Sequence, residues 1–164
     1  MPKKRFSTGL VWIWVAAAVL LIDRCSKIWM VNHLAPYQPR AILPFFNFTL
    51  AYNTGAAFSF LHSASGWQNI FFGGLAAIVS IVIIYSLIKL SAKEIWVSIA
   101  LCLILGGALG NAWDRILYQY VVDFLDFHLG DWHFAIFNLA DSAIFVGAVM
   151  LLWHWLVTSR SLSK

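Results

Sequence analysis

The sequence predicts a membrane protein of the all-α class with four transmembrane helices. Hydrophobic residues make up 62% of the chain, against about 45–50% in ordinary domains. Charged residues make up 11%, against about 25%. So few charges cannot cover a water-soluble surface, and four apolar segments are long enough to cross a bilayer. The length of 164 residues indicates a single domain, 1–164.

The four segments follow from bilayer thickness. A hydrocarbon core of about 30 Å requires about 20 helical residues. The segments that meet this length are residues 10–30, 67–88, 95–113 and 139–156. The last two are short, so we expect them to gain or lose a turn. We expect the first segment to be an uncleaved anchor, because no small-residue cleavage site follows its apolar core.

Basic residues set the predicted orientation. Seven of the 11 Lys and Arg residues lie before the first segment, between the second and third, or after the fourth. The positive-inside rule places these regions, and so both termini, in the cytoplasm. Loops 31–66 and 114–138 are then extracytoplasmic. Basic residues sorted in this way do not form a stripe, so we expect no nucleic-acid partner.

The two outer loops predict a small sheet. Residues 46–53 alternate, which indicates a strand with one face formed by Phe46, Phe48, Leu50 and Tyr52. Residues 121–129 and 132–134 flank Gly130-Asp131, a two-residue hairpin turn. The sheet must lie above the hydrocarbon or against protein, because its exposed edge cannot lie in lipid.

Two shorter signals accompany this sheet. The apolar stretch 56–61 predicts a short helix at the membrane interface. In the third segment, the small residues between Gly106 and Gly110 favour close helix packing.

Asp123 and Asp141 indicate hydrolytic chemistry. Asp123 follows the third segment, Asp141 lies in the first turn of the fourth, and the turn between the segments brings both to one depth. Two facing carboxyl groups cannot both ionise easily, so such a pair retains one proton over a wide pH range. One carboxylate then draws a proton from water while the other carboxyl group protonates a substrate carbonyl, as in aspartic proteases.

Structural interpretations compete for these acids. Asn138, three residues before Asp141, fits a helix N-cap followed by a first-turn acid. Asp123 is also compatible with a solvated loop acid. We interpret Asp126 and Asp131 as solvated loop acids.

Other polar residues lie near the same depth. Asp23 and Lys27 are four residues apart on the first segment, which predicts an ion pair. Asp114 ends the third segment, where the helix dipole disfavours an acid, so we expect the adjacent Arg115 to compensate it. Three amides are able to bond the backbone, to orient a carboxylate or to hold a substrate peptide: Asn53, Asn111 and Asn138.

Metal and serine chemistry find little support in the sequence. His128 and His133 would pair across the predicted hairpin, near Asp126 and Asp131, but we interpret them as solvated strand residues. The chain has no His-Glu-x-x-His or Cys-x-x-Cys motif for zinc. It also lacks the Gly-x-Ser-x-Gly motif of serine hydrolases.

The chain resembles the bacterial lipoprotein signal peptidases, which form the signal peptidase II family. The resemblance rests on five ordered blocks: DRCSK at 23–27, NTGAAFS at 53–59, GGALGNAWDR at 106–115, VDF at 122–124 and FNLAD at 137–141. It implies four transmembrane helices, a small extracytoplasmic β-cradle and a short interfacial helix.

The resemblance also implies an activity. The family cuts prolipoproteins on the N-terminal side of a diacylglyceryl-modified cysteine. Its catalytic aspartates fall on Asp123 and Asp141, and no metal or organic cofactor is implied. Its other motif residues, which would shape the site and hold the substrate, fall on Asp23, Lys27, Asn53, Gly55, Asn111, Asp114, Arg115, Asn138 and Ala140.

We therefore expect an intramembrane aspartic endopeptidase of the bacterial cytoplasmic (inner) membrane. It would act as a monomer on diacylglyceryl-prolipoproteins in membrane lipid, with its active site on the extracytoplasmic side. We expect Asp141, at a helix N-terminus, to be the base and Asp123 to carry the proton. We also expect strand residues around Asn53 to clamp the unwound substrate.

Two alternatives come from other functional classes. One is a small transporter or proton relay lined by carboxylates, and the other is a chaperone that binds lipidated peptides without cutting them. Transporters usually place their site near the membrane midplane between repeats. Here the acids cluster at one surface, which favours the peptidase.

Overall fold

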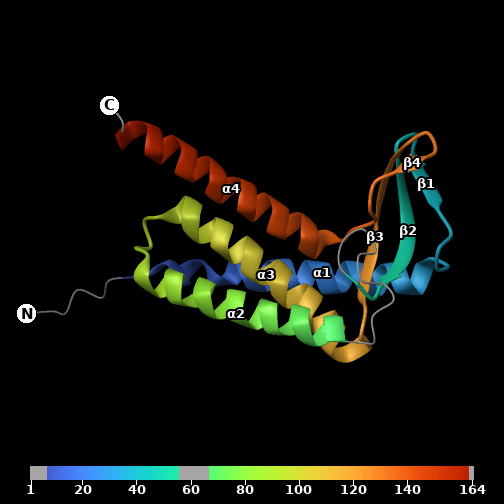
Figure 1. The fold of residues 1–164 in the computed structure, drawn as a ribbon, viewed down its shortest axis with the longest axis horizontal. Helices are drawn as coiled ribbons and strands as arrows, with labels where there is room; N and C mark the ends of the chain where they lie inside the picture. The colour runs from blue at the N-terminus through green and yellow to red at the C-terminus, as the bar shows by residue number, and fades with distance from the viewer. Residues whose placement is uncertain (1–6, 56–66, 163–164) are drawn as a thin grey trace, which may run out of the picture.

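Four long helices and a small sheet make up the computed structural model, which describes residues 7–55 and 67–162 (Figure 1). A 3₁₀ turn, η1 (Gly9–Trp12), leads into α1 (Ile13–His33). The other helices are α2 (Trp67–Lys89), α3 (Ile95–Tyr118) and α4 (Leu139–Leu162). Within the described part of the chain, these four are the helices long and apolar enough to cross a membrane.

The third helix ends later than the sequence predicts. It runs to Tyr118, beyond the expected Trp113, and Gln119 stops it with a left-handed φ of 65° and an N–H bond to the Arg115 carbonyl. Asp114 and Arg115 therefore lie inside α3 and not in the loop 114–138. This difference matters because a helix gives their side chains fixed and divergent directions.

An antiparallel sheet covers one end of the helices (Figure 1). Its strands, in spatial order, are β1 (Arg40–Leu43), β2 (Phe46–Asn53), β3 (Val121–Leu129) and β4 (Trp132–His133). The predicted strand 46–53 and the hairpin turn at Gly130, whose φ is 59°, are confirmed. The short, exposed strand β1 carried no alternating pattern and was not predicted.

The predicted alternation of β2 holds over only part of the strand. The pairing of β2 with β3 shifts between Phe48 and Ala51, so one register does not extend along the whole strand. Asn47 and Thr49, on the face expected to be polar, are buried together with Leu50. The predicted interfacial helix at 56–61 lies outside the described residues.

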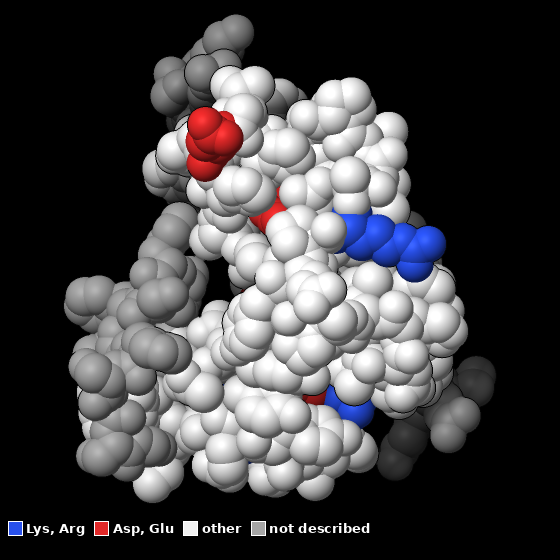
Figure 2. Space-filling view, turned by 90° about the vertical axis from the view of Figure 1, so that its right-hand side faces the viewer, with Lys and Arg blue, Asp and Glu red and all other residues white. Residues whose placement is uncertain are grey.

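Apolar contacts fix the sheet to the helices. Met30 near the end of α1 packs with Leu50 of β2 and with Val122 and Phe124 of β3. The surface at this end carries few charged side chains (Figure 2). The apolar contacts hold the sheet next to the end of α3 and the start of α4.

The small residues of α3 allow the helices to approach closely, as predicted. A Cβ atom placed on Gly106 would lie 2.6 Å from the backbone oxygen of Ala16 on α1 and 2.7 Å from the Val19 Cβ. Because one of these atoms belongs to the backbone, the contact cannot be relieved by a side-chain rotation. A glycine at position 106 is therefore required for the observed distance between α1 and α3.

We predict that Gly106→Ala lowers stability by about 1–3 kcal/mol, the usual cost of overpacking. Gly74→Ala on α2 is the matched control, because nothing lies within 4 Å of its added Cβ. Thermal melting in detergent should show a clear decrease for Gly106→Ala and none for Gly74→Ala. Equal melting temperatures would contradict the packing argument.

Candidate active site

Lys27 lies at the centre of a buried polar cluster. Its side chain is 1% exposed, and its Nζ lies 2.8 Å from Asp23 Oδ2 and 2.9 Å from Asp114 Oδ2. Nζ also donates to Asn111 Oδ1 at 3.1 Å. The predicted pair with Asp23 is confirmed, and Lys27 Nζ lies close to one oxygen on α1 and two on α3.

The two carboxylates around Lys27 each hold a second part of the fold. Asp23 Oδ1 accepts the backbone N–H of Ala140 at 3.0 Å, in the first turn of α4. Asp114 Oδ2 accepts the backbone N–H of Val122 at 3.2 Å, at the start of β3. Asp23 and Asp114 therefore connect the helix bundle to the two elements that carry Asp141 and Asp123.

The prediction that Arg115 offsets the charge of Asp114 is wrong. Asp114 pairs with Arg24 and with Lys27, both on α1. Adjacent residues on a helix point in different directions, so Arg115 is turned away and lines a pocket, with its guanidinium 4.9 Å from the centre of the Phe72 ring. Arg24 was not predicted, because its partner is 90 residues away in the chain.

Lys27 also fixes the orientation of the Asn111 amide. An ammonium group only donates hydrogen bonds, so Asn111 must turn its oxygen toward Lys27 and its nitrogen away from it. That nitrogen donates to Asp141 Oδ1 at 2.7 Å. By fixing this amide, Lys27 directs the Asn111 donor at the Asp141 carboxylate.

Asn138 connects the two aspartates. Its Nδ2 donates to Asp123 Oδ1 at 2.7 Å, and its backbone N–H donates to Asp141 Oδ2 at 3.2 Å. Its Oδ1 accepts the backbone N–H of Asp141 at 2.9 Å, which closes a reciprocal cap at the start of α4. The N-cap interpretation of Asn138 is therefore confirmed, and the same cap places the Asp141 carboxylate beside the Asp123 site.

Asp123 lies on β3 and is buried, with 2% of its surface exposed. Its Oδ2 accepts the Asn53 amide at 2.9 Å, and the backbone N–H of Gly55 holds the Asn53 oxygen at 3.0 Å. Burial, and then the charge of Asp141, raise the pKa of Asp123 to about 7, although the bonds from Asn53 and Asn138 oppose this rise. The interpretation as a solvated loop acid is wrong, and Asp123 exchanges its proton near neutral pH.

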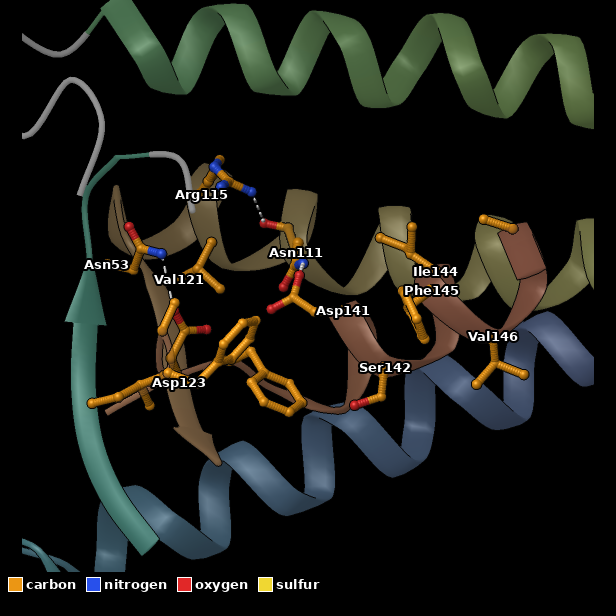
Figure 3. A pocket seen from close by; sticks show the side chains of 15 residues that line it. Asn53, Asn111, Arg115, Val121, Asp123, Asp141, Ser142, Ile144, Phe145 and Val146 are labelled. Carbon is orange, nitrogen blue, oxygen red and sulfur yellow. Dashed lines mark hydrogen bonds between the residues drawn. The ribbon is translucent and has the colours of Figure 1, made fainter. Parts of the chain in front are cut away.

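Both carboxylates line one pocket of about 690 Å³, which we call the α4 pocket (Figure 3). In Figure 3, Asn53 lies next to Asp123 and Asn111 lies next to Asp141. One wall follows α4 through apolar side chains such as Ile144 and Phe145. The arrangement combines two carboxyl groups, one of them titrating near neutrality, with an apolar groove along a membrane-spanning helix.

A second pocket, which we call the sheet pocket, has a volume of about 620 Å³. It meets the α4 pocket at Asn53 and Asp123, and at the segment 134–136. From Asp123 it extends over β2 toward Tyr37 and Tyr52.

Asp126 is not the solvated acid that the sequence predicted. It is 1% exposed, and its carboxylate accepts the Thr49 hydroxyl at 2.7 Å and pairs with His133 at 2.8 Å. The burial depends on the register of β2 and β3, which sequence periodicity does not reveal. His128 and His133 pair across β3 and β4 as predicted. Among the described residues, no three His, Cys, Asp or Glu side chains are grouped to hold a metal.

Comparisons with known proteins found relatives of this chain. The family model described as signal peptidase (SPase) II matches residues 15–157. A lipoprotein signal peptidase of Coxiella burnetii (strain RSA 331 / Henzerling II) is 51% identical over 162 residues, which cover 98% of this chain and 99% of the relative. A lipoprotein signal peptidase of Yersinia enterocolitica is 44% identical over 158 residues, covering 96% and 94%.

The fold has a counterpart among solved structures. A bacterial membrane enzyme superposes with a TM-score of 0.82 at 32% identity, covering 94% of this chain and 92% of the other. The similarity therefore includes both the helices and the sheet.

We predict that Lys27→Met destabilises the protein strongly, by about 3–5 kcal/mol, because it leaves buried carboxylates without their charge partner. Arg24→Met serves as the matched control, because the Arg24 side chain is 16% exposed and water is able to replace it. Melting in detergent should show the larger decrease for Lys27→Met. Equal decreases would show that Lys27 does not have a central role.

Proposed function

The chain belongs to the signal peptidase II family, which removes signal peptides from prolipoproteins, and we propose that Asp123 and Asp141 carry out this hydrolysis. The observation that carries the proposal is that the two carboxyl groups share Asn138 and line the same pocket. The protein is thus an aspartic-type signal peptidase with four membrane-spanning helices.

In the proposed reaction Asp141 is the base and Asp123 is the acid. Asp141 accepts a proton from water as the water oxygen bonds to the scissile carbonyl carbon, and Asp123 gives its proton to the carbonyl oxygen. Asp141 then passes its proton to the amide nitrogen as the C–N bond breaks, and the hydroxyl that becomes the new carbonyl returns a proton to Asp123. The pKa of Asp123 near 7 supports its role as acid, and a helix N-terminus stabilises a carboxylate at position 141.

The other site residues support the pair or the substrate. Asn53, Gly55, Asn111 and Asn138 fix the two carboxyl groups, and Asp23, Lys27, Asp114 and Ala140 hold the elements on which they stand. Arg115 lines the α4 pocket and is placed to bind a substrate carbonyl. The apolar wall of this pocket suits the signal peptide, and the diacylglyceryl chains of the cysteine would extend into the surrounding lipid.

The membrane arrangement follows from the charges. The protein is a multi-pass protein of the bacterial inner membrane, and the distribution of Lys and Arg supports cytoplasmic termini with the site on the extracytoplasmic side. We propose that the chain works as a monomeric domain spanning 1–164, because a single copy supplies both carboxyl groups. The proposed reaction uses no metal, organic cofactor or nucleic acid.

We expect Asp123→Asn and Asp141→Asn each to lower cleavage by at least about 10³-fold, since either change removes an acid–base group and disrupts the pair. Purified protein in detergent, given a lipidated prolipoprotein, would report cleavage as a shortened product. Asp131→Asn, at an exposed hairpin turn, is the control and should cut as wild type does. Full activity in either pair variant would contradict the proposed mechanism and favour a binding or transport role.

Cleavage should decrease as the pH rises above about 7, because Asp123 then loses the proton that it donates. Asn53→Ala removes a hydrogen bond that favours the carboxylate, so it should move this decrease to higher pH. The same change should lower kcat/KM by about tenfold, since it removes a hydrogen bond to the carboxylate that forms as Asp123 gives up its proton. The measurement is kcat/KM between pH 5 and 9, with Asn32→Ala, exposed at the end of α1, as control.

An unchanged pH profile and rate in Asn53→Ala would contradict the assignment of the acid to Asp123.

A further inference from the structure

Asp126 is a buried carboxylate that the proposed reaction does not use. It lies on β3, and its Oδ2 accepts the Thr49 hydroxyl at 2.7 Å and the Asn47 amide at 3.5 Å, both from β2. Burial alone would raise the pKa of Asp126, but the hydrogen bonds from Thr49 and His133 outweigh it, and the pKa lies below its ordinary value. Asp126 is therefore an anion at neutral pH.

This anion orients His133. The Nδ1 atom of His133 lies 2.8 Å from Asp126 Oδ1, and the ring stacks on His128 with centroids 5.0 Å apart. A carboxylate requires a proton on the nitrogen that faces it, so Nδ1 is the bound N–H and Nε2 is left for another partner. Across residues 7–55 and 67–162, Nε2 has no hydrogen-bond partner, and the side chain is 45% exposed.

His133 lines the sheet pocket and lies between Asp123 and Asp141 in the sequence. The pocket meets the α4 pocket at Asp123, so the two pockets extend in different directions from one carboxyl group. One follows the apolar surface of α4, and the other lies over the sheet between Tyr37 and His133. A substrate cut at Asp123 would place its two halves in the two pockets.

We propose that the sheet pocket receives the residues that follow the lipidated cysteine, and that His133 is a specificity-determining residue which favours a hydroxyl or amide side chain there. This inference rests on the proposed function, because the apolar signal peptide then takes the α4 pocket. Hydroxyl and amide groups both donate and accept, so they bond to Nε2 in either protonation state of the ring. An apolar side chain would leave that nitrogen unpaired.

Two lipidated peptides that differ only in the residue after the modified cysteine test this inference. One carries Asn and the other carries Leu, and the readout is the ratio of their kcat/KM values in detergent. Wild type should prefer the Asn peptide by about three- to tenfold, the contribution of one hydrogen bond. His133→Phe keeps an aromatic ring but removes both nitrogens, so it should slow cleavage of the Asn peptide more than cleavage of the Leu peptide and bring the ratio close to one. His133→Gln should retain the preference.

A wild-type ratio of one, or a preference that persists in His133→Phe, would overturn the inference. If His133→Phe lowers the melting temperature, His133→Gln and His133→Leu are compared in its place. Equal Asn-to-Leu ratios of kcat/KM in these two variants would also overturn the inference. Failure of the proposed function gives a different result: wild type would cut neither peptide, or Asp123→Asn would still cut both.

Discussion

The buried ammonium of Lys27 is the constraint on which the rest of the site depends. Its Nζ pairs with Asp23 and Asp114 and donates to Asn111. Each of these residues holds a further group: Asp23 the start of α4, Asp114 the start of β3, and Asn111 the carboxylate of Asp141. A buried ion costs several kcal/mol to desolvate, so its partners must be placed well for the fold to form. One charge on α1 therefore determines where a helix and a strand from the far half of the chain begin, and these are the elements that carry the two aspartates.

The same network makes two identical residues chemically unequal. Asp123 stands on a strand, is almost fully buried and is held by the side-chain amides of Asn53 and Asn138. Asp141 stands at a helix N-terminus and is held by the Asn111 amide and a backbone N–H, a setting that stabilises a carboxylate. Asn138 bonds to both residues, so one residue positions both carboxyl groups. In the proposed reaction, the acid and the base therefore differ only in their positions, because the residue type is the same at both.

Features that depend on local periodicity could be predicted from the sequence, and features that depend on register could not. The four spans, strand β2 and the hairpin after β3 follow from runs and alternations within a few residues. The Asp23–Lys27 pair follows from helical spacing. Arg24 and the burial of Asp126 were missed because their partners come from distant segments, Asp114 on α3 and Thr49 on β2. The end of α3 was missed because the left-handed residue there is Gln119, a type that gives little sign of this conformation.

Peptide cleavage requires an extended substrate, and the sheet gives this otherwise helical protein a surface that can hold one. A carbonyl inside a signal-peptide helix is already hydrogen-bonded and is closed to attack. The α4 pocket follows a helix and the sheet pocket follows strands, and they meet at Asp123. A substrate chain that occupied both pockets would have to leave helical geometry where they meet, and the carbonyl freed there would lie next to Asp123, whose pKa is raised to about 7. In the proposed reaction, substrate unwinding and proton donation therefore occur at one position, because β3 supplies both a strand of the sheet and Asp123.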